Sequence, residues 1–361
     1  MADVGSDLID FVAQVGGEKN LRVEENLGEG FVRLRVAEAE RRQAKHDIRC
    51  VEDIVVEMLR NSRDAGAKHI FVATTKEDSL RTLIILDDGS GIPSHMQPRI
   101  FDARVTSKLE SMHMDKWGIH GRGMAMFSVK ENVEEARVCS SEVGLGASIK
   151  VLSDTTRLDE RTDQSTWPQA GVDDDGQEVI VRGPHNIIRT CCEFGLEEKN
   201  QCEVYFGSPA EIISAMRAYI KPTLDAHELL FVDNINTLPV LERFYVAADA
   251  TELASCANEC GLDVSERTIH RILAGQVKPA RNVYNKVKRI KDSDDEPRKV
   301  NLLKDRRGLK IDKGDIDQFS RDMERSFKPL ADCYYLKLTD DPKVKVSKNK
   351  ITVTFTVDHK D

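Results

Sequence analysis

The chain lacks the long apolar runs, paired cysteines and internal repeats that mark several large classes of protein. Its longest apolar stretches have the length of a strand, well below the roughly 18 to 20 residues needed to span a bilayer. The amino terminus has neither the basic start nor the apolar core of a secretory signal. The eight cysteines include no C-x-x-C pair, which argues against a disulfide framework and a zinc module. These absences predict a cytoplasmic protein with no membrane partner.

The composition is that of a globular chain with an uneven distribution of charge. The 361 residues are 40% apolar and 32% charged, enough for a sizeable core and about two or three domains. A net charge of −9 does not suggest a general nucleic-acid coat. However, eight lysines and arginines stand against one acidic residue between positions 265 and 291. The acidic chain therefore contains one basic segment.

The order of expected elements indicates an α+β fold. A helical period runs over residues 51–64, and two β-rich runs at 69–75 and 81–87 are spaced as a hairpin. A glycine-punctuated region at 89–123 is too long for an ordinary loop, so we interpret it as a functional lid. One more helix, three strands and an acidic loop at 154–178 complete a mixed α/β sandwich.

The pattern changes twice in the rest of the chain. After about residue 208 the apolar spacing is mostly helical, and the charged segment at 291–299 is typical of a solvated linker. The tail contains one helical segment and two strand-like runs. We therefore predict five regions: a lead-in at 1–24, a sandwich domain at 25–210, a helical domain at 211–290, a linker at 291–300 and a small α/β region at 301–361.

A polar stripe runs along the first predicted helix. Glu57, Asn61 and Asp64 stand at i, i+4 and i+7, about a third of a turn from the apolar face. A carboxylate in such a place can orient a water molecule, and an amide oxygen can bind Mg²⁺. By itself, the stripe is more typical of a solvated helix flank.

The second strand of the predicted hairpin ends in a carboxylate followed by glycines. Asp87 closes the apolar run, and Gly89 and Gly91 permit a tight turn and a close approach of the backbone to a ligand. Such an aspartate can accept a hydrogen bond from an exocyclic amine while the glycines leave room for a flat ring. A plain Asp-Gly turn is the alternative.

The lid contains two further elements that suit phosphate. Hydroxyl groups and a cation occur together at Thr106, Ser107 and Lys108. Three glycines then precede a predicted helix, where backbone N–H groups and the helix amino terminus can bind an anion. These glycines are Gly118, Gly121 and Gly123. Alone, this glycine spacing is a weak signal.

In this order and spacing, the four elements together resemble the GHKL, or Bergerat-fold, ATPases. The helix motif and the T-S-K lid are most similar to those of the B subunit of type IIB topoisomerases and of MutL-type mismatch-repair proteins. The resemblance extends over residues 25–210, with its specific motifs between 57 and 123. It implies a Bergerat-type sandwich of a mixed sheet with helices on one face.

The resemblance also implies a role for each matched residue on the helix and after the strand. Glu57 would be the general base that activates water, and Asn61 would hold Mg²⁺ against the phosphates of ATP. Asp87 would bind the adenine amine while Asp64 supports the pocket. The remaining positions would complete the nucleotide site: Gly89 and Gly91 at the adenine; Thr106, Ser107, Lys108, Gly118, Gly121 and Gly123 in the lid; and Ser148 as the nearest match to a later strand hydroxyl.

The basic segment lies in a second recognisable pattern. Apolar positions of a first short helix, including the helix-spaced Cys256 and Cys260, are expected to share a core. Gly261 follows, and a second helix begins after Ser265. This pattern resembles the DNA-binding helices of phage repressors. Its exposed positions would contact double-stranded DNA through Arg267, His270, Arg271, Lys278 and Arg281. A purely structural or partner-binding bundle is an equal alternative.

The sequence therefore predicts a Mg²⁺-dependent ATPase. The resemblance implies a homodimer that closes on ATP and acts on double-stranded DNA with a separate nuclease or topoisomerase-like partner. Two alternatives stay open: a signalling kinase of the histidine-kinase type, and a regulatory module that binds nucleotide without useful turnover. The T-S-K lid and the lack of a phosphoacceptor helix before residue 50 weigh against the kinase.

Overall fold

The computed structural model divides the chain into two compact units. They comprise residues 1–292 and 293–361, and each is considered by itself. The structure describes residues 23–29, 31–34, 38–106, 113–115, 118–120, 123–172, 177–229, 231–232, 234–287, 313–347 and 350–359. Among these residues, no helix is both long and apolar enough to cross a membrane.

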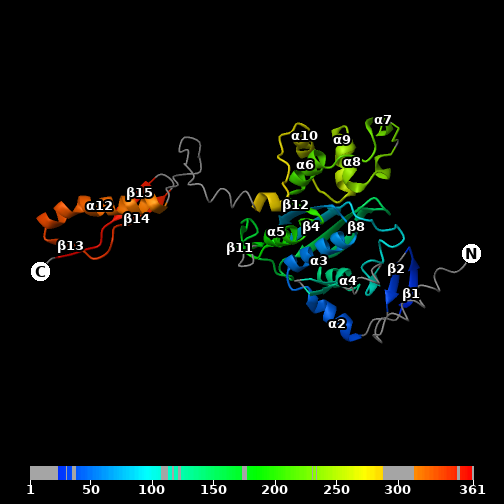
Figure 1. The fold of residues 1–361 in the computed structure, drawn as a ribbon, viewed down its shortest axis with the longest axis horizontal. Helices are drawn as coiled ribbons and strands as arrows, with labels where there is room; N and C mark the ends of the chain where they lie inside the picture. The colour runs from blue at the N-terminus through cyan, green and yellow to red at the C-terminus, as the bar shows by residue number, and fades with distance from the viewer. Residues whose placement is uncertain are drawn as a thin grey trace, which may run out of the picture. The chain divides into compact units, whose positions relative to one another are not determined.

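A five-stranded mixed sheet forms the centre of the first unit (Figure 1). Its strands are β3 (His69–Glu77), β4 (Leu80–Asp87), β8 (Glu135–Ser141), β9 (Ala147–Asp154) and β12 (Glu203–Gly207). They lie in the order β12, β3, β4, β9, β8, and only the β12–β3 pairing is parallel within this sheet. The predicted mixed architecture is confirmed.

The predicted hairpin is also present, with a shorter connection than the sequence pattern indicated. β3 and β4 pair from Ile70 opposite Asp87 to Glu77 opposite Leu80. Only two residues join the strands, because Asp78 adopts the left-handed conformation with φ 51° that a tight hairpin turn needs. Asp87 is therefore the last residue of a strand that is paired on both sides.

Three helices cover one face of this sheet. They are α3 (Val51–Asp64), α4 (Ala125–Asn132) and α5 (Ile187–Glu197). The predicted helix over residues 51–64 is α3, and its Ile54, Met58 and Leu59 pack into one core with Leu83 and Ile85 of β4. Each such buried side chain stabilises the fold by about 1.5–3 kcal/mol. This core anchors the helix that carries the polar stripe.

The later helical region covers the opposite face of the sheet (Figure 1). Its helices are α6 (Pro209–Tyr219), α7 (Ala226–Leu229), α8 (Val240–Val246), α9 (Ala250–Glu259) and α10 (Glu266–Leu273), with a 3₁₀ turn at Ile235–Thr237. Phe71, Ile84 and Leu86 of the sheet share a core with Met216 and Phe244. The helical region thus continues the first unit, and the domain boundary at residue 210 stays a prediction.

A small sheet joins the amino-terminal hairpin to the middle of the predicted lid. It contains β1 (Val23–Gly28), β2 (Phe31–Leu34) and β5 (Val105–Thr106), and α2 (Glu38–Asp47) follows the hairpin. Arg33 links the two parts, since its guanidinium bonds to Glu25 at 3.0 Å and to Asp102 at 2.9 Å. Later in the lid, β6 (His113–Asp115) pairs with β7 (Gly118–His120).

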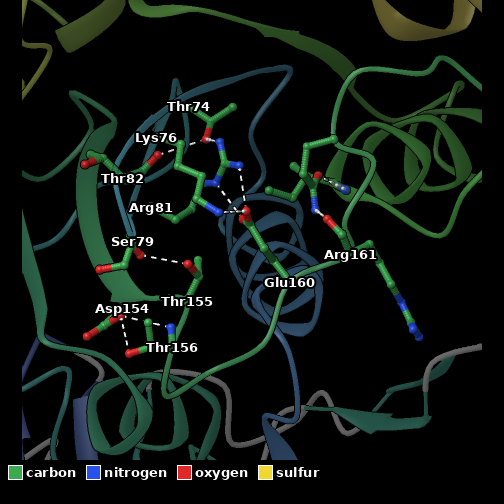
Figure 2. A network of polar contacts seen from close by, with 12 residues as sticks. Thr74, Lys76, Ser79, Arg81, Thr82, Asp154, Thr155, Thr156, Glu160 and Arg161 are labelled. Atoms are coloured by element: carbon green, nitrogen blue, oxygen red, sulfur yellow. Dashed lines mark hydrogen bonds and ion pairs between the residues drawn. The ribbon is translucent and has the colours of Figure 1, made fainter.

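The acidic loop at 154–178 is fixed to the far end of the sheet by a network of ion pairs (Figure 2). Glu160 receives Arg81 Nε at 2.7 Å and Lys76 Nζ at 2.7 Å. Burial acts to raise the pKa of Glu160, but these cations hold it below its usual value. The loop prediction was incomplete, because β10 (Gln169–Val172) lies inside it and pairs with β11 (Glu178–Arg182).

The described residues of the second unit form one long helix and two two-stranded sheets. Its elements are α12 (Lys313–Cys333), β13 (Leu336–Leu338), β14 (Lys343–Ser347), β15 (Lys350–Thr354) and β16 (Val357–His359). β13 pairs with β16 and β14 pairs with β15. Phe327 of the helix stacks on Phe355, with ring centroids 4.5 Å apart. The predicted helix is therefore confirmed, while the two predicted strands are four short ones.

Candidate active site

A cavity of about 1790 Å³ lies beside α3 at the end of β4. Its lining includes Glu57, Asn61 and Asp64 of α3, Asp87 of β4, and Gly123 just before α4. The structure therefore brings parts of three separate sequence elements to one place. The polar stripe of α3 borders a hollow, which the solvated-flank alternative does not require.

Asp87 is held by donors on three sides of its carboxylate. Ser62 Oγ donates to it at 2.7 Å and the Gly89 N–H at 3.0 Å, and the Ala147 N–H contributes a further bond. Burial raises the pKa of Asp87 to about 6, although these hydrogen bonds oppose the shift. At neutral pH the group is thus mostly an ionised, fixed acceptor at the cavity wall.

The glycines after Asp87 are required by contacts between two loops. Gly91 has φ 71°, and a Cβ there would lie 1.9 Å from the carbonyl oxygen of Glu142. Gly146 has φ 77°, and its Cβ would lie 2.1 Å from the carbonyl oxygen of Asp87. A Cβ on Gly89 would meet Ala65 at 2.9 Å. These glycines therefore serve the packing of the site as well as any space for a ring.

Glu57 is oriented by an arginine one turn further along α3. Arg60 Nη1 lies 2.9 Å from Glu57 Oε1, and the arginine side chain is only 3% exposed while that of Glu57 is 21% exposed. The carboxylate is thus held at the cavity edge with partial access to solvent. This is a suitable position for a group that must meet a water molecule.

Asn61 and Asp64 have partners that define their orientation. Asn61 Nδ2 donates to Met126 Sδ of α4 at 3.2 Å, which occupies the nitrogen end of the amide. Asp64 Oδ1 lies 2.9 Å from Arg63 Nε, and the same guanidinium reaches Glu198 at 2.7 Å. Asp64 therefore belongs to a bridge between α3 and the end of α5, and the role implied for it in the nucleotide pocket stays a prediction.

The segment that forms most of the cavity is similar in sequence to known proteins. Residues 46–166 match the family model described as the histidine kinase-, DNA gyrase B- and HSP90-like ATPase. This segment is a GHKL ATPase domain. It contains α3, the glycine turn after β4, α4 and β9, all of which contribute residues to the lining of the cavity.

Two DNA mismatch repair proteins MutL are similar to part of the chain. The protein from Chelativorans sp. (strain BNC1) is 40% identical over 76 residues, which is 21% of this chain and 12% of that protein. The protein from Thermus thermophilus is 34% identical over 84 residues, or 22% of this chain and 14% of that protein. The matches thus span less than a seventh of either relative.

Two residues that the sequence analysis did not select also line the cavity of the GHKL domain. Ser62 supplies the hydroxyl that bonds to Asp87, and it is buried together with Val55, Met58 and Leu59. The sequence signal for Ser62 was that a polar residue stands among the apolar residues on the buried stripe of an amphipathic helix. Arg104 is 4% exposed and lines the cavity just before β5, in the middle of the predicted lid. Nothing in the spacing of the motifs distinguishes it.

The structure does not bring Ser148 to the cavity of the GHKL domain. Its hydroxyl donates to the carbonyl oxygen of Cys260 at 2.7 Å, on the face covered by the helical region. Side chains alternate along a strand, and the neighbouring Ala147 and Ile149 line the cavity instead. We therefore correct the assignment of Ser148: it connects β9 to the helices, and Ser62 supplies the hydroxyl at Asp87.

Part of the lid motif falls outside the described residues. Ser107, Lys108 and Gly121 belong to that part, so their assignment stays a prediction. Thr106 pairs with Val32 through β5, and Gly118 begins β7. The roles implied for these two residues at the phosphates stay predictions as well.

The five residues proposed to contact DNA lie on the surface. α9 and α10 are joined across Gly261, whose φ is 76°, and the Ser265 hydroxyl caps α10. Ile269 and Ile272 of α10 point inward and are buried. The exposed residues are Arg267, His270, Arg271, Lys278 and Arg281. The predicted burial of Cys256 and Cys260 on the inner side is confirmed.

Proposed function

We propose that the GHKL domain binds ATP together with Mg²⁺ and hydrolyses it. The carrying observation is the arrangement around one cavity: an ionised, buried Asp87 on one side, with Glu57 and Asn61 of α3 on another. Asp87 would accept a hydrogen bond from the amine of a purine. Glu57 and Asn61 would face the hydrated phosphates of the same ligand. The family match supports the same ligand.

At the adenine end, the fixed carboxylate of Asp87 would select which nucleotide base is bound. Asp87 already accepts bonds from Ser62 and Gly89, so its position does not depend on the ligand. A carboxylate has more acceptor sites than these donors use, and an exocyclic amine can donate to one that is left. An oxygen at the same position of the base would instead place one acceptor against another, so the site would favour adenine over guanine.

At the phosphate end, the protein offers few oxygen ligands, which suits a Mg²⁺ ion that is held mainly by the phosphates of the nucleotide. No group of three or more His, Cys, Asp or Glu side chains that could hold a metal occurs among the described residues. Mg²⁺ commonly keeps several waters and takes one or two protein oxygens besides phosphates. Asn61 offers an amide oxygen for this purpose, and bound Mg²⁺ would neutralise phosphate charge. Glu57 would accept the proton of the attacking water.

The wider role that we propose is an ATP-gated homodimer acting on DNA with a partner subunit. Two observations support it. The similar proteins named above are DNA mismatch repair proteins, and α10 with the segment after it presents Arg267, Arg271, Lys278 and Arg281 on the surface. Such a basic face suits the phosphates of double-stranded DNA. The partner would be a nuclease or topoisomerase-like protein, and a cytoplasmic location stays our expectation.

The test is ATP hydrolysis by the purified chain, with and without Mg²⁺ and duplex DNA. We expect Mg²⁺-dependent turnover that DNA stimulates, and a fall of about 10²- to 10⁴-fold in Glu57→Gln, because removal of a general base has effects of that size. ATP binding by the variant should persist. Glu131→Gln on α4 is the matched control and should keep normal turnover. Undiminished hydrolysis by Glu57→Gln would remove Glu57 from the role of base.

One observation favours the regulatory alternative as a second candidate. The Arg60 guanidinium lies 2.9 Å from the Glu57 carboxylate. Glu57 would therefore have to take up a proton while its carboxylate is still bonded to this arginine. A protein that binds ATP but turns it over slowly would then act as a switch. Tight ATP binding without measurable hydrolysis, with or without DNA, would support this candidate.

A further inference from the structure

The amide of Asn61 can serve a metal ion at only one of its two ends. Its oxygen is a ligand of the kind that Mg²⁺ prefers, whereas its NH₂ group is a donor that cannot bind a cation. The two ends have nearly the same size, so half a turn of the amide exchanges them without a steric penalty. A metal site that uses this residue therefore needs a neighbour that distinguishes oxygen from nitrogen.

Met126 is such a neighbour. Asn61 Nδ2 donates to Met126 Sδ at 3.2 Å, across the contact between α3 and α4. A thioether sulfur is a weak acceptor and has no hydrogen to donate, so it can bond only to the nitrogen end of an amide. The reversed amide would place its oxygen against the lone pairs of the sulfur. The contact with Met126 thus favours one of the two orientations of Asn61.

The orientation that Met126 favours leaves the oxygen of Asn61 accessible. Both residues line the cavity, and so does Glu57, one turn earlier on α3. In the described part of the chain, Asn61 Oδ1 accepts no hydrogen bond, and the buried side-chain oxygens that lack one are Glu52 Oε2 and Ser153 Oγ. Asn61 Oδ1 is therefore not buried, and the open space that borders its side chain is the cavity.

The sulfur is held in place by the packing of α4. Met126 stands in the first turn of this helix, three residues after Gly123, and packs partly buried against the core around α3. Val129, on the next turn, is fully buried in that core. The Ser128 hydroxyl bonds to the Met124 carbonyl oxygen at 2.9 Å and closes the first turn. The position of the sulfur is therefore set by the fold rather than by a ligand.

We propose that Met126 is a positioning residue for the metal ion, an inference that rests on the proposed ATP function. Its sulfur holds the nitrogen end of Asn61, so that the oxygen end is turned toward Mg²⁺ bound with the nucleotide. The sulfur itself is not a ligand, because Mg²⁺ takes oxygen rather than soft thioether ligands. Asn61 is thus oriented before the ion arrives, and the side-chain freedom that is lost on binding is reduced.

Two variants of Met126 separate orientation from packing. Met126→Leu conserves volume and apolar character but offers no acceptor, whereas Met126→Gln has a similar length and offers an amide oxygen to Asn61 Nδ2. Calorimetric titration with ATP at a series of Mg²⁺ concentrations measures the Mg²⁺ requirement of binding, and titration in EDTA measures binding without the ion. We expect Met126→Leu to need about three- to tenfold more Mg²⁺, because its Asn61 must be turned and immobilised by the ion. The Mg²⁺ requirement of Met126→Gln, and the affinity of both variants in EDTA, should stay within twofold of the unaltered protein.

A change at Asn61 supplies the control. A carboxylate has an oxygen at both ends, so Asn61→Asp makes the orientation of this side chain irrelevant. In that background, adding Met126→Leu should leave the Mg²⁺ requirement within twofold of Asn61→Asp alone. A packing role of Met126 would instead produce the same loss in both backgrounds. Thermal unfolding of each variant establishes that the fold is intact, and this comparison decides alone if Met126→Gln does not fold.

The outcomes distinguish this inference from the proposed function. An unchanged Mg²⁺ requirement in folded Met126→Leu overturns the inference alone, and so does a larger loss in Met126→Gln than in Met126→Leu. If the unaltered protein does not bind ATP, or binds it equally well with and without Mg²⁺, the proposed function fails and the inference falls with it. A loss in Met126→Leu that the Asn61→Asp background abolishes supports both.

Discussion

Both faces of the central sheet have an apolar core, but their polar residues are arranged differently. On the face covered by α3, α4 and α5, the core reaches a cavity edged by Glu57, Asn61 and Asp87. On the face covered by the later helices, Ser148 is fully buried and bonded to Cys260. The difference separates a buried polar group that is bonded within the core from polar groups that share one cavity, and only the latter are candidates for binding a ligand.

The strongest test of this contrast is to damage the helical face alone. Phe244 of α8 is fully buried against Leu86 and its neighbours, so Phe244→Ala should lower the free energy of unfolding by about 3–5 kcal/mol. The affinity of the folded fraction for ATP should stay within a factor of two. Chemical denaturation and nucleotide titration measure the two quantities. A large loss of affinity with little loss of stability would mean that the faces are not separable.

A smaller effect is expected from acid at the cavity face. The pKa of Asp87 is about 6, so ATP binding should weaken as pH falls through 6, where the protonated carboxyl no longer offers a charged acceptor. The raised pKa also means that Asp87 favours folding below its ordinary pKa of 3.8, and that this contribution is lost as pH rises through about 6.

Asp87→Asn should reduce ATP affinity by about 10- to 100-fold, the size of a lost charged hydrogen bond.

Ser62→Ala sharpens the pH experiment. The Ser62 hydroxyl lowers the pKa of Asp87, so its removal should move the midpoint of ATP binding to higher pH. Titrations at several pH values with the unaltered protein, Ser62→Ala and Asp87→Asn measure this. A midpoint that is the same in all three proteins would show that Asp87 does not control binding.

The smallest effect should come from Ser148→Ala on the helical face. Loss of one buried hydrogen bond should lower the free energy of unfolding by about 1 kcal/mol, with ATP affinity and the pH midpoint unchanged. Denaturation and titration of the same preparation measure both. A selective loss of ATP affinity would restore Ser148 to the nucleotide site and contradict its structural role.

Local patterns predicted those elements whose side chains repeat with a clear period. The limits of α3 agree with the helical period over 51–64, and the β3–β4 hairpin follows from two β-rich runs separated by a few polar residues. α5 was not predicted, although Asn186 caps it and its buried residues follow a helical period; the available signal in the sequence was overlooked. β10 was missed inside an acidic segment.

The site was predicted where the chemistry follows from residue type and spacing, and missed where it depends on tertiary packing. Glu57, Asn61, Asp64 and Asp87 all line the cavity. The face of Ser148 could have been inferred from the alternation along β9, since Ile149 and Val151 belong to the α3 core. The role of Ser62 could not, because it requires the end of β4 to lie next to α3.

The close contact between the loops at 87–92 and 141–146 has a mechanical consequence. Gly91 and Gly146 leave no room between the loops, and the Gly144 N–H bonds to the Ser90 carbonyl oxygen at 2.7 Å. The first amide of α8, that of Val240, bonds in turn to the carbonyl oxygen of Leu145 at 2.8 Å. We therefore expect a displacement of the chain beside Asp87 to be coupled to α8. The helical side is therefore linked through backbone hydrogen bonds to the glycine turn that follows Asp87.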